Sequence, residues 1–131
     1  MRTLATTLAL AAVLTAGCSS GSAVEYPPSS ADDVDVTEDL QAAAGGEPWA
    51  QLITEATRTE DDRLEVRTTV VDPRAAGSPE MGQPAIDICS AAVQWLQAQG
   101  AGDPDVSVME ADGSTYVVFG HPSYPGGCTE V

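Results

Sequence analysis

Three cysteines and one histidine are the side chains of this 131-residue chain best suited to covalent, redox or metal chemistry. Cys18 follows a run of small residues near the N-terminus, whereas Cys89 and Cys128 lie in the second half. In a small exported protein such a pair most simply forms one disulfide, and a closed loop of roughly 40 residues corresponds to about 4 kcal/mol in the chain-entropy model. A reactive thiol, or a metal site that includes His121, is the alternative.

The first 17 residues have the three parts of a secretory signal peptide. Arg2 supplies the positive charge, Leu4 to Val13 form an apolar stretch, and small residues precede the cysteine. An apolar stretch of about ten residues is too short to span a bilayer core of about 30 Å. We therefore expect an export signal in residues 1–17 rather than a permanent transmembrane anchor.

The residues that end at Cys18 predict a lipid attachment site. The sequence Leu14-Thr15-Ala16-Gly17-Cys18 resembles a lipobox, the motif at which the lipoprotein signal peptidase cuts. This resemblance implies that Cys18 carries a diacylglyceryl group and ties the protein to the extracytoplasmic face of the cell membrane. The Ser/Gly-rich residues that follow are typical of a flexible tether. Ordinary secretion without a lipid is the alternative.

The charge of the chain limits its partners. It carries 20 acidic and 5 basic residues, a formal net charge of −15, and every basic residue is arginine. Such a charge repels nucleic acids and anionic lipid headgroups. We therefore expect no nucleic-acid partner, and either high solubility or a basic partner.

The motifs of common enzymes are missing from the sequence. There is no Gly-x-Ser-x-Gly nucleophile pattern and no glycine-rich phosphate loop, and the one histidine, His121, sits between Gly120 and Pro122 in an apparent loop. The acidic runs at residues 32–35 and 60–62 lack the ligand spacing of a calcium-binding loop. A pair of catalytic carboxylates is not excluded by composition, but a small domain offers little cleft to bury one. We expect no catalytic residues, no cofactor and no metal.

The aromatic residues divide into a core group and an exposed group. Trp49, Trp95 and Phe119 are expected to pack in the core of a chain that has only six aromatic residues. Tyr124 lies in a Ser-Tyr-Pro-Gly-Gly segment that is typical of an exposed loop. Together with His121, it is the candidate for a shallow recognition surface.

The organisation of the chain follows from its apolar pattern. Residues 18–46 contain few large apolar residues and many acids, and are expected to form an acidic tether, with a helical turn near 37–44 that Thr37 could cap. The folded domain is expected over 47–131, opening with a short helix from Pro48 in which Trp49, Leu52, Ile53 and Ala56 recur at helical spacing. Alternating apolar residues then predict a strand over 64–71.

The remaining elements have clearer signals. A wide apolar face predicts a long helix over 84–99, and Asp112-Gly113 between two runs of strand-forming residues predicts a hairpin of 106–110 and 115–119. We expect the tail over 120–131 to fold back across the end of the sheet if Cys89 and Cys128 are joined. The sequence thus predicts an α+β domain of order α-β-α-β-β, with a three-stranded sheet covered on one face by helices and one disulfide.

Residues 82–131 resemble a group of small lipoproteins from actinobacteria and their phages. The resemblance rests on the helix Ile86-Asp87-Ile88-Cys89-Ser90-Ala91-Ala92-Val93, a Val-x-Val strand, an Asp-Gly hairpin and the final Cys-Thr-Glu-Val. The group has no characterised function, so the resemblance implies a location and a disulfide but no activity. Some phage-encoded lipoproteins block superinfection, which makes exclusion of a competing phage one possible role.

These observations lead to two hypotheses about function. The first is a non-enzymatic interaction module of the cell envelope, held at the membrane by a lipid on Cys18 and bound to an envelope or phage protein. The alternative is a small-ligand-binding lipoprotein that serves a transporter or an envelope enzyme. That alternative requires a pocket of a few hundred Å³ with converging polar groups.

Overall fold

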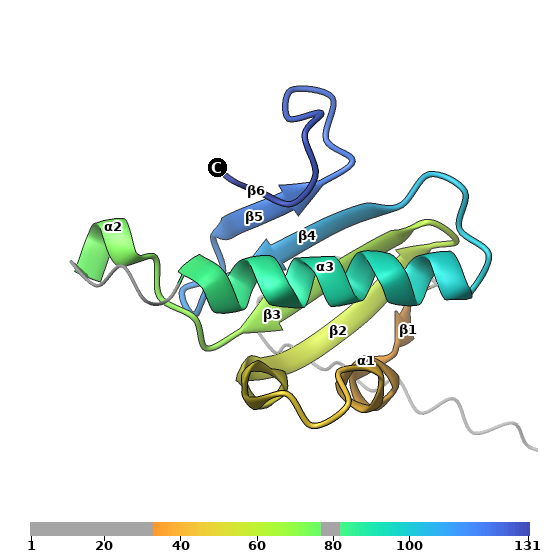
Figure 1. The fold of residues 1–131 in the computed structure, drawn as a ribbon, viewed down its shortest axis with the longest axis horizontal. Helices are drawn as coiled ribbons and strands as arrows, with labels where there is room; N and C mark the ends of the chain where they lie inside the picture. Colours follow the sequence, from red (N-terminus) through yellow and green to blue (C-terminus); the bar gives the residue numbers. More distant parts are fainter. Residues whose placement is uncertain (1–32, 77–81) are drawn as a thin grey trace, which may run out of the picture.

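The computed structural model describes residues 33–76 and 82–131, which form one mixed sheet with helices on one of its faces (Figure 1). In chain order the elements are β1 (Val34–Asp35), α1 (Thr37–Ala43), the 3₁₀ helix η1 (Pro48–Leu52), β2 (Ile53–Glu60), β3 (Arg63–Thr68), α2 (Pro73–Ala76), α3 (Gly82–Ala98), β4 (Asp105–Met109), β5 (Thr115–Phe119) and β6 (Thr129–Glu130).

The six strands lie in the sheet in the same order as in the sequence, from β1 at one edge to β6 at the other. Neighbouring strands are antiparallel except β3 and β4, which are parallel. A parallel pair needs a long crossover, and α3 supplies it. The expected α-β-α-β-β domain with a three-stranded sheet is therefore wrong, because the sheet has twice that number of strands.

The largest error concerns the short helix expected from Pro48 up to the polar run at residues 59–62. Only Pro48–Leu52 is helical, and the chain continues from Ile53 as the longest strand of the sheet. A β-bulge near Ile53 puts two residues of β2 opposite Arg67, so the buried side chains of Ile53 and Ala56 are three residues apart. This spacing imitates a helix, although the backbone is a strand.

The folded region also begins earlier than Glu47. β1 and α1 lie within the segment expected to be a tether, and they contribute the buried side chains of Val36 and Leu40 to the core. Thr37 does not cap α1; its hydroxyl accepts a hydrogen bond from the Ala56 N–H (2.8 Å) and donates one to Asp35 Oδ1 (2.6 Å). β1 pairs only with Thr57 and Arg58 of β2. At the next residue, Ala56, the backbone N–H of β2 is bonded to the Thr37 side chain of α1 instead of to a strand.

The core lies between the sheet and α3. Ala56, Val66, Val108 and Val117 are aligned across the four central strands, and each is at most 1% exposed. They belong to one buried cluster with the α3 residues Ala85, Ile88, Cys89, Ala92, Val93 and Leu96, the apolar face that the sequence indicated. Alternate residues such as Glu65, Arg67 and Ser107 point to the opposite face, which no element covers in the described parts of the chain.

The hairpin of β4 and β5 forms at Asp112-Gly113, as the sequence indicates. Gly113 has φ of 88°, which favours glycine, and Ser114 donates its N–H to Asp112 Oδ1 at 2.8 Å. Val108 pairs with Val117 but Met109 pairs with Thr115, so Tyr116 is an extra residue in β5. This bulge turns the Tyr116 side chain to the inside, where it is 1% exposed.

Candidate functional site

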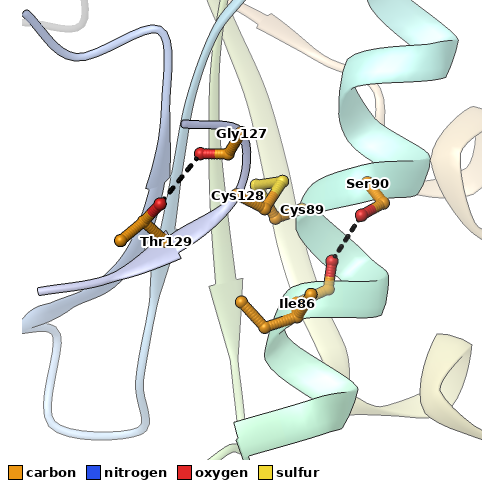
Figure 2. Close-up of a disulfide and its surroundings, with 6 residues drawn as sticks. All are labelled: Ile86, Cys89, Ser90, Gly127, Cys128 and Thr129. Atoms are coloured by element: carbon orange, nitrogen blue, oxygen red, sulfur yellow. Dashed lines mark hydrogen bonds between the residues drawn. A yellow bond between two sulfur atoms is a disulfide. The ribbon is translucent and has the colours of Figure 1, made fainter. Parts of the chain in front are cut away.

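The disulfide joins the middle of α3 to the last residues of the chain (Figure 2). Cys89 is fully buried, Cys128 is partly exposed, and their Cα atoms are 6.1 Å apart. Thr129 donates its hydroxyl to the Gly127 carbonyl (3.1 Å) beside the bond. The paired state of the two cysteines is thus confirmed. The tail does not cross the end of the sheet as expected; it adds β6 alongside β5.

The bond also fixes one end of the loop between β5 and β6, residues 120–128. The other end is Gly120, which has φ of 82°, and a Cβ at this position would collide with the Pro104 carbonyl oxygen. Only glycine fits such a close approach in this backbone conformation. Both ends of the loop are therefore fixed to the body of the domain, and the loop between them projects beyond β5 and β6 (Figure 1).

The projecting loop carries His121 and Tyr124 side by side. Their ring centroids are 5.5 Å apart with the planes tilted by 45°. A turn holds them there: the Tyr124 N–H donates to the His121 carbonyl (2.9 Å), and the Ser123 N–H donates to His121 Nδ1 (3.1 Å). Residues 121–126 are all exposed. The two residues singled out in the sequence thus share one small surface, with Nε2 of His121 and the Tyr124 hydroxyl as its polar groups.

A second cluster, centred on Tyr116, holds the chain that follows the loop. The Tyr116 hydroxyl donates to Glu130 Oε1 (2.7 Å), and the Arg74 guanidinium lies 5.7 Å from the centre of the Tyr116 ring. Arg74 also donates to the Val131 carbonyl oxygen (2.6 Å). Burial, and next the Glu130 carboxylate, raise the pKa of Tyr116 above its ordinary value. The phenol therefore stays protonated and serves as a hydrogen-bond donor.

Space in this cluster is tight. A Cβ added to Gly82, at the start of α3, would lie 2.5 Å from Glu130 Oε1 and 3.2 Å from the Tyr116 hydroxyl. The backbone of α3 therefore approaches the Tyr116–Glu130 pair closely. We call Arg74, Tyr116 and Glu130 the Tyr116 cluster. We interpret it as a structural cluster that holds β6 in place, because its polar groups bond to one another and to the chain end.

An open cleft of about 650 Å³ lies at the other end of the domain, between the β2–β3 turn and the end of α3. Arg58 is its one cation, and the guanidinium is turned to its own hairpin, donating to the Glu60 carbonyl (3.3 Å) and the Asp61 carbonyl (2.5 Å). The remaining side chains are mainly acidic or small. The cleft is lined by Arg58, Glu60, Asp61, Asp62, Gln99, Gly100, Ala101 and Gly102.

All four arginines of the described residues are in ion pairs. Arg58 pairs with Asp61 (3.7 Å) and Arg74 with Asp72 (2.9 Å). Arg63 contacts both Glu60 (2.7 Å) and Asp105 (3.2 Å), and Arg67 contacts Glu55 (3.6 Å). Within residues 33–76 and 82–131, most of the other carboxylates have no arginine partner.

The other candidates of the sequence have mixed positions. Cys18 and the signal segment lie outside the described residues. Trp49, Trp95 and Phe119 pack against the core but are only partly buried. Over residues 33–76 and 82–131, no group of three or more histidine, cysteine or acidic residues could hold a metal ion, and no helix is long and apolar enough to cross a membrane.

Sequence reasoning missed the role of Tyr116. It is the largest fully buried side chain, yet it follows an exposed turn and precedes two valines, a pattern that predicts a strand but not a bulge. The nearby Glu130 lies in the segment 120–131, which the sequence indicates only as a tail. The available signals were a tyrosine in a strand and a glutamate near the second cysteine. Neither signal predicts that the two side chains form a hydrogen bond.

Comparisons with known proteins add no further information. A scan against protein-family models, a search of curated proteins and a search of solved structures each gave no match.

Proposed function

We propose that this chain is a lipid-anchored interaction module of the cell envelope that binds another macromolecule through the loop 120–128. The observation that carries the proposal is the way this loop is presented: both ends are fixed, by Gly120 and by Cys128, and residues 121–126 are exposed. A loop whose conformation is fixed before binding loses less entropy when it binds. The role proposed is recognition rather than catalysis.

The side chains of the loop suit recognition. Tyrosine combines a large contact area with few rotatable bonds, and it is enriched at binding surfaces. Tyr124 is 38% exposed and is held beside His121 by the turn. Pro122 directly follows His121 and Pro125 directly follows Tyr124, and both restrict the backbone further.

Crosslinking in living cells tests the loop. A photoreactive phenylalanine analogue in place of Tyr124 should give a discrete adduct after irradiation, and the same analogue in place of the exposed Gln97 on α3 should not. His121→Ala should reduce the adduct formed at position 124. Identical patterns at the two positions, or no adduct at 124, would contradict the proposal.

The anchor needs a separate test. The lipobox-like residues before Cys18 support a lipoprotein with residues 1–17 removed. Mass spectrometry of the exported protein should find the mature chain starting at an acylated Cys18. An unmodified Cys18 would rule out the anchor, whatever the loop binds.

The resemblance to phage lipoproteins supports a specific form of the proposal, in which the partner is a component of an infecting phage. Expression of the chain should then lower DNA injection by related phages, and the Tyr124→Ala variant should restore it. Unchanged infection in cells that express the chain would exclude this form, while leaving an envelope partner open to the crosslinking test.

The alternative, a small-ligand-binding lipoprotein that serves a transporter or an envelope enzyme, is favoured by the cleft of about 650 Å³. Its lining predicts a cationic or hydroxyl-rich ligand. Native mass spectrometry of the protein purified from its own envelope should then detect a bound small molecule that Asp62→Asn removes. The absence of any such molecule would count against this alternative.

A further inference from the structure

A groove on the helical side of the domain combines an indole ring with two carboxylates. It has a volume of about 380 Å³ and lies between the connection from α1 to η1 and the outer side of α3. Trp49 and Glu47 line it from one side and Asp87 from the other. The remaining lining consists of small or polar residues: Ala43, Ala44, Ser90, Ala91 and Gln94.

Local structure places the three functional groups. Pro48 is the first residue of η1, so Glu47 precedes the helix and is exposed, while Trp49 packs against the core with part of its ring and stays partly exposed. Asp87 is on α3, and its Oδ1 accepts a hydrogen bond from Gln83 (2.8 Å). In the described part of the chain, neither carboxylate has an arginine partner, because all four arginines are paired elsewhere.

We propose that this groove binds a lysine or arginine side chain from a basic segment of a partner protein. A cation is attracted to the face of an indole ring and to carboxylates, and tryptophan is the strongest aromatic partner for it. The alanines leave room for the aliphatic stem of a long basic side chain. The groove shares no residue with the loop 120–128, which projects beyond β6, whereas α1 lies on the β1 side of the domain (Figure 1). This second surface therefore stands even if the loop binds nothing.

The occupant must come from another kind of molecule. Outside the described residues, Arg2 is the one basic side chain, and it lies in the segment expected to be removed as a signal peptide. Residues 18–32 and 77–81 contain no lysine or arginine, so those segments cannot supply the cation. A second copy of the chain brings the same net charge of −15 and would be repelled. Charge complementarity therefore points to a basic partner.

Fluorescence titration tests the proposal. The probe is an acetylated, amidated pentapeptide of alternating arginine and glycine, added to the full chain in a nonionic detergent at low salt. Trp95→Phe leaves Trp49 as the single tryptophan that reports binding. The peptide should change the Trp49 emission in a saturable manner, and the effect should weaken as salt is added.

Two paired variants separate the groove from the overall charge. Glu47→Gln with Asp87→Asn should weaken peptide binding about tenfold, since both carboxylates that face the cation are neutralised. Glu38→Gln with Asp39→Asn removes the same charge from exposed positions of α1 outside the groove. This control pair should weaken binding less than about twofold.

Three results would overturn the proposal. The first is the absence of saturable binding, and the second is equal weakening by the two pairs, which would mean attraction to the net charge alone. The third is binding of choline or spermidine as tight as that of the peptide, which would mean that the occupant is a free amine rather than a protein segment.

Discussion

At the β1 edge of the sheet the chain is held by burial, whereas at the β6 edge it is held by a covalent bond. Val36 and Leu40 fill the core beside β2, and the Thr37 hydroxyl and the Gln41 amide bond to the backbone of β2. Over residues 120–131, the segment that contains β6, no large apolar side chain is fully buried, and the Cys89–Cys128 bond joins it to α3. A segment that buries little cannot offset its ordering entropy by packing, so it needs a crosslink.

The largest effect is expected from removal of the disulfide. Cys89→Ala with Cys128→Ala should lower the free energy of unfolding by about 4 kcal/mol, because the bond closes a loop between residues 39 apart in sequence. Denaturant unfolding measures the loss. The unmodified protein under reducing conditions is the matched control, since it has no added cavity. Equal stability with and without reductant would mean that the disulfide does not hold the β6 edge, and would contradict the difference drawn between the two edges.

Loss of apolar burial at the β1 edge should come next. Leu40 is fully buried, so Leu40→Ala should cost about 3 kcal/mol. Reduction of the disulfide should leave this cost unchanged, since Leu40 and Cys128 lie at opposite edges. If the cost depends strongly on the state of the disulfide, the two edges are not independent.

The Tyr116 cluster should contribute less to the free energy of unfolding than Leu40 does, and its contribution should depend on pH. Tyr116→Phe removes the hydrogen bond to Glu130 and should cost about 1.5 kcal/mol at neutral pH. Because burial raises the pKa of Tyr116 in the folded state, the folded protein retains this proton above the unfolded pKa of about 10. The stability of the unmodified protein should therefore be level below that pH and fall above it.

The Tyr116→Phe variant should lose this alkaline decline. Tyr124→Phe, on the exposed loop, is the matched control and should keep it. Unfolding by denaturant at several pH values between neutral and alkaline makes the comparison. A decline that survives in the Tyr116 variant would assign the pH dependence to another group.

The smallest effect is expected from Thr37. Thr37→Val removes the acceptor of the Ala56 N–H and should cost about 1 kcal/mol. Hydrogen exchange of the Ala56 amide should become faster, and Thr54→Val, at an exposed position of β2, should leave that amide unchanged. An Ala56 amide that remains equally protected would show that β1 and α1 hold the edge without this bond.

The sequence predicted the parts of the fold whose signals are local. The apolar face of α3, the Asp112-Gly113 turn and the pairing of the two cysteines all follow from residue type and spacing. Bulges, by contrast, depend on strand pairing, and two of them obscured the alternation of apolar and polar residues that identifies a strand. One made Ile53 and Ala56 look helical, and the other buried Tyr116.

Long-range contacts explain the remaining difference. Leu40 lies in an acidic, alanine-rich segment, and its side chain is buried because it packs in one cluster with residues of β2 and α3. For the candidate site, residue type alone indicated that His121 and Tyr124 share an exposed loop. The groove at Trp49 joins residues from η1 and α3, and no sequence spacing relates them.

The attachment of Cys128 to α3 has a mechanical consequence. At the C-terminal end of the loop 120–128, an applied force reaches the disulfide before it reaches the two-residue strand β6. The load therefore passes into the longest helix, which packs across the central strands, and does not peel the hydrogen bonds of the sheet edge one pair at a time. The partner proposed for the loop would thus pull against the middle of the domain as well as against the edge of the sheet.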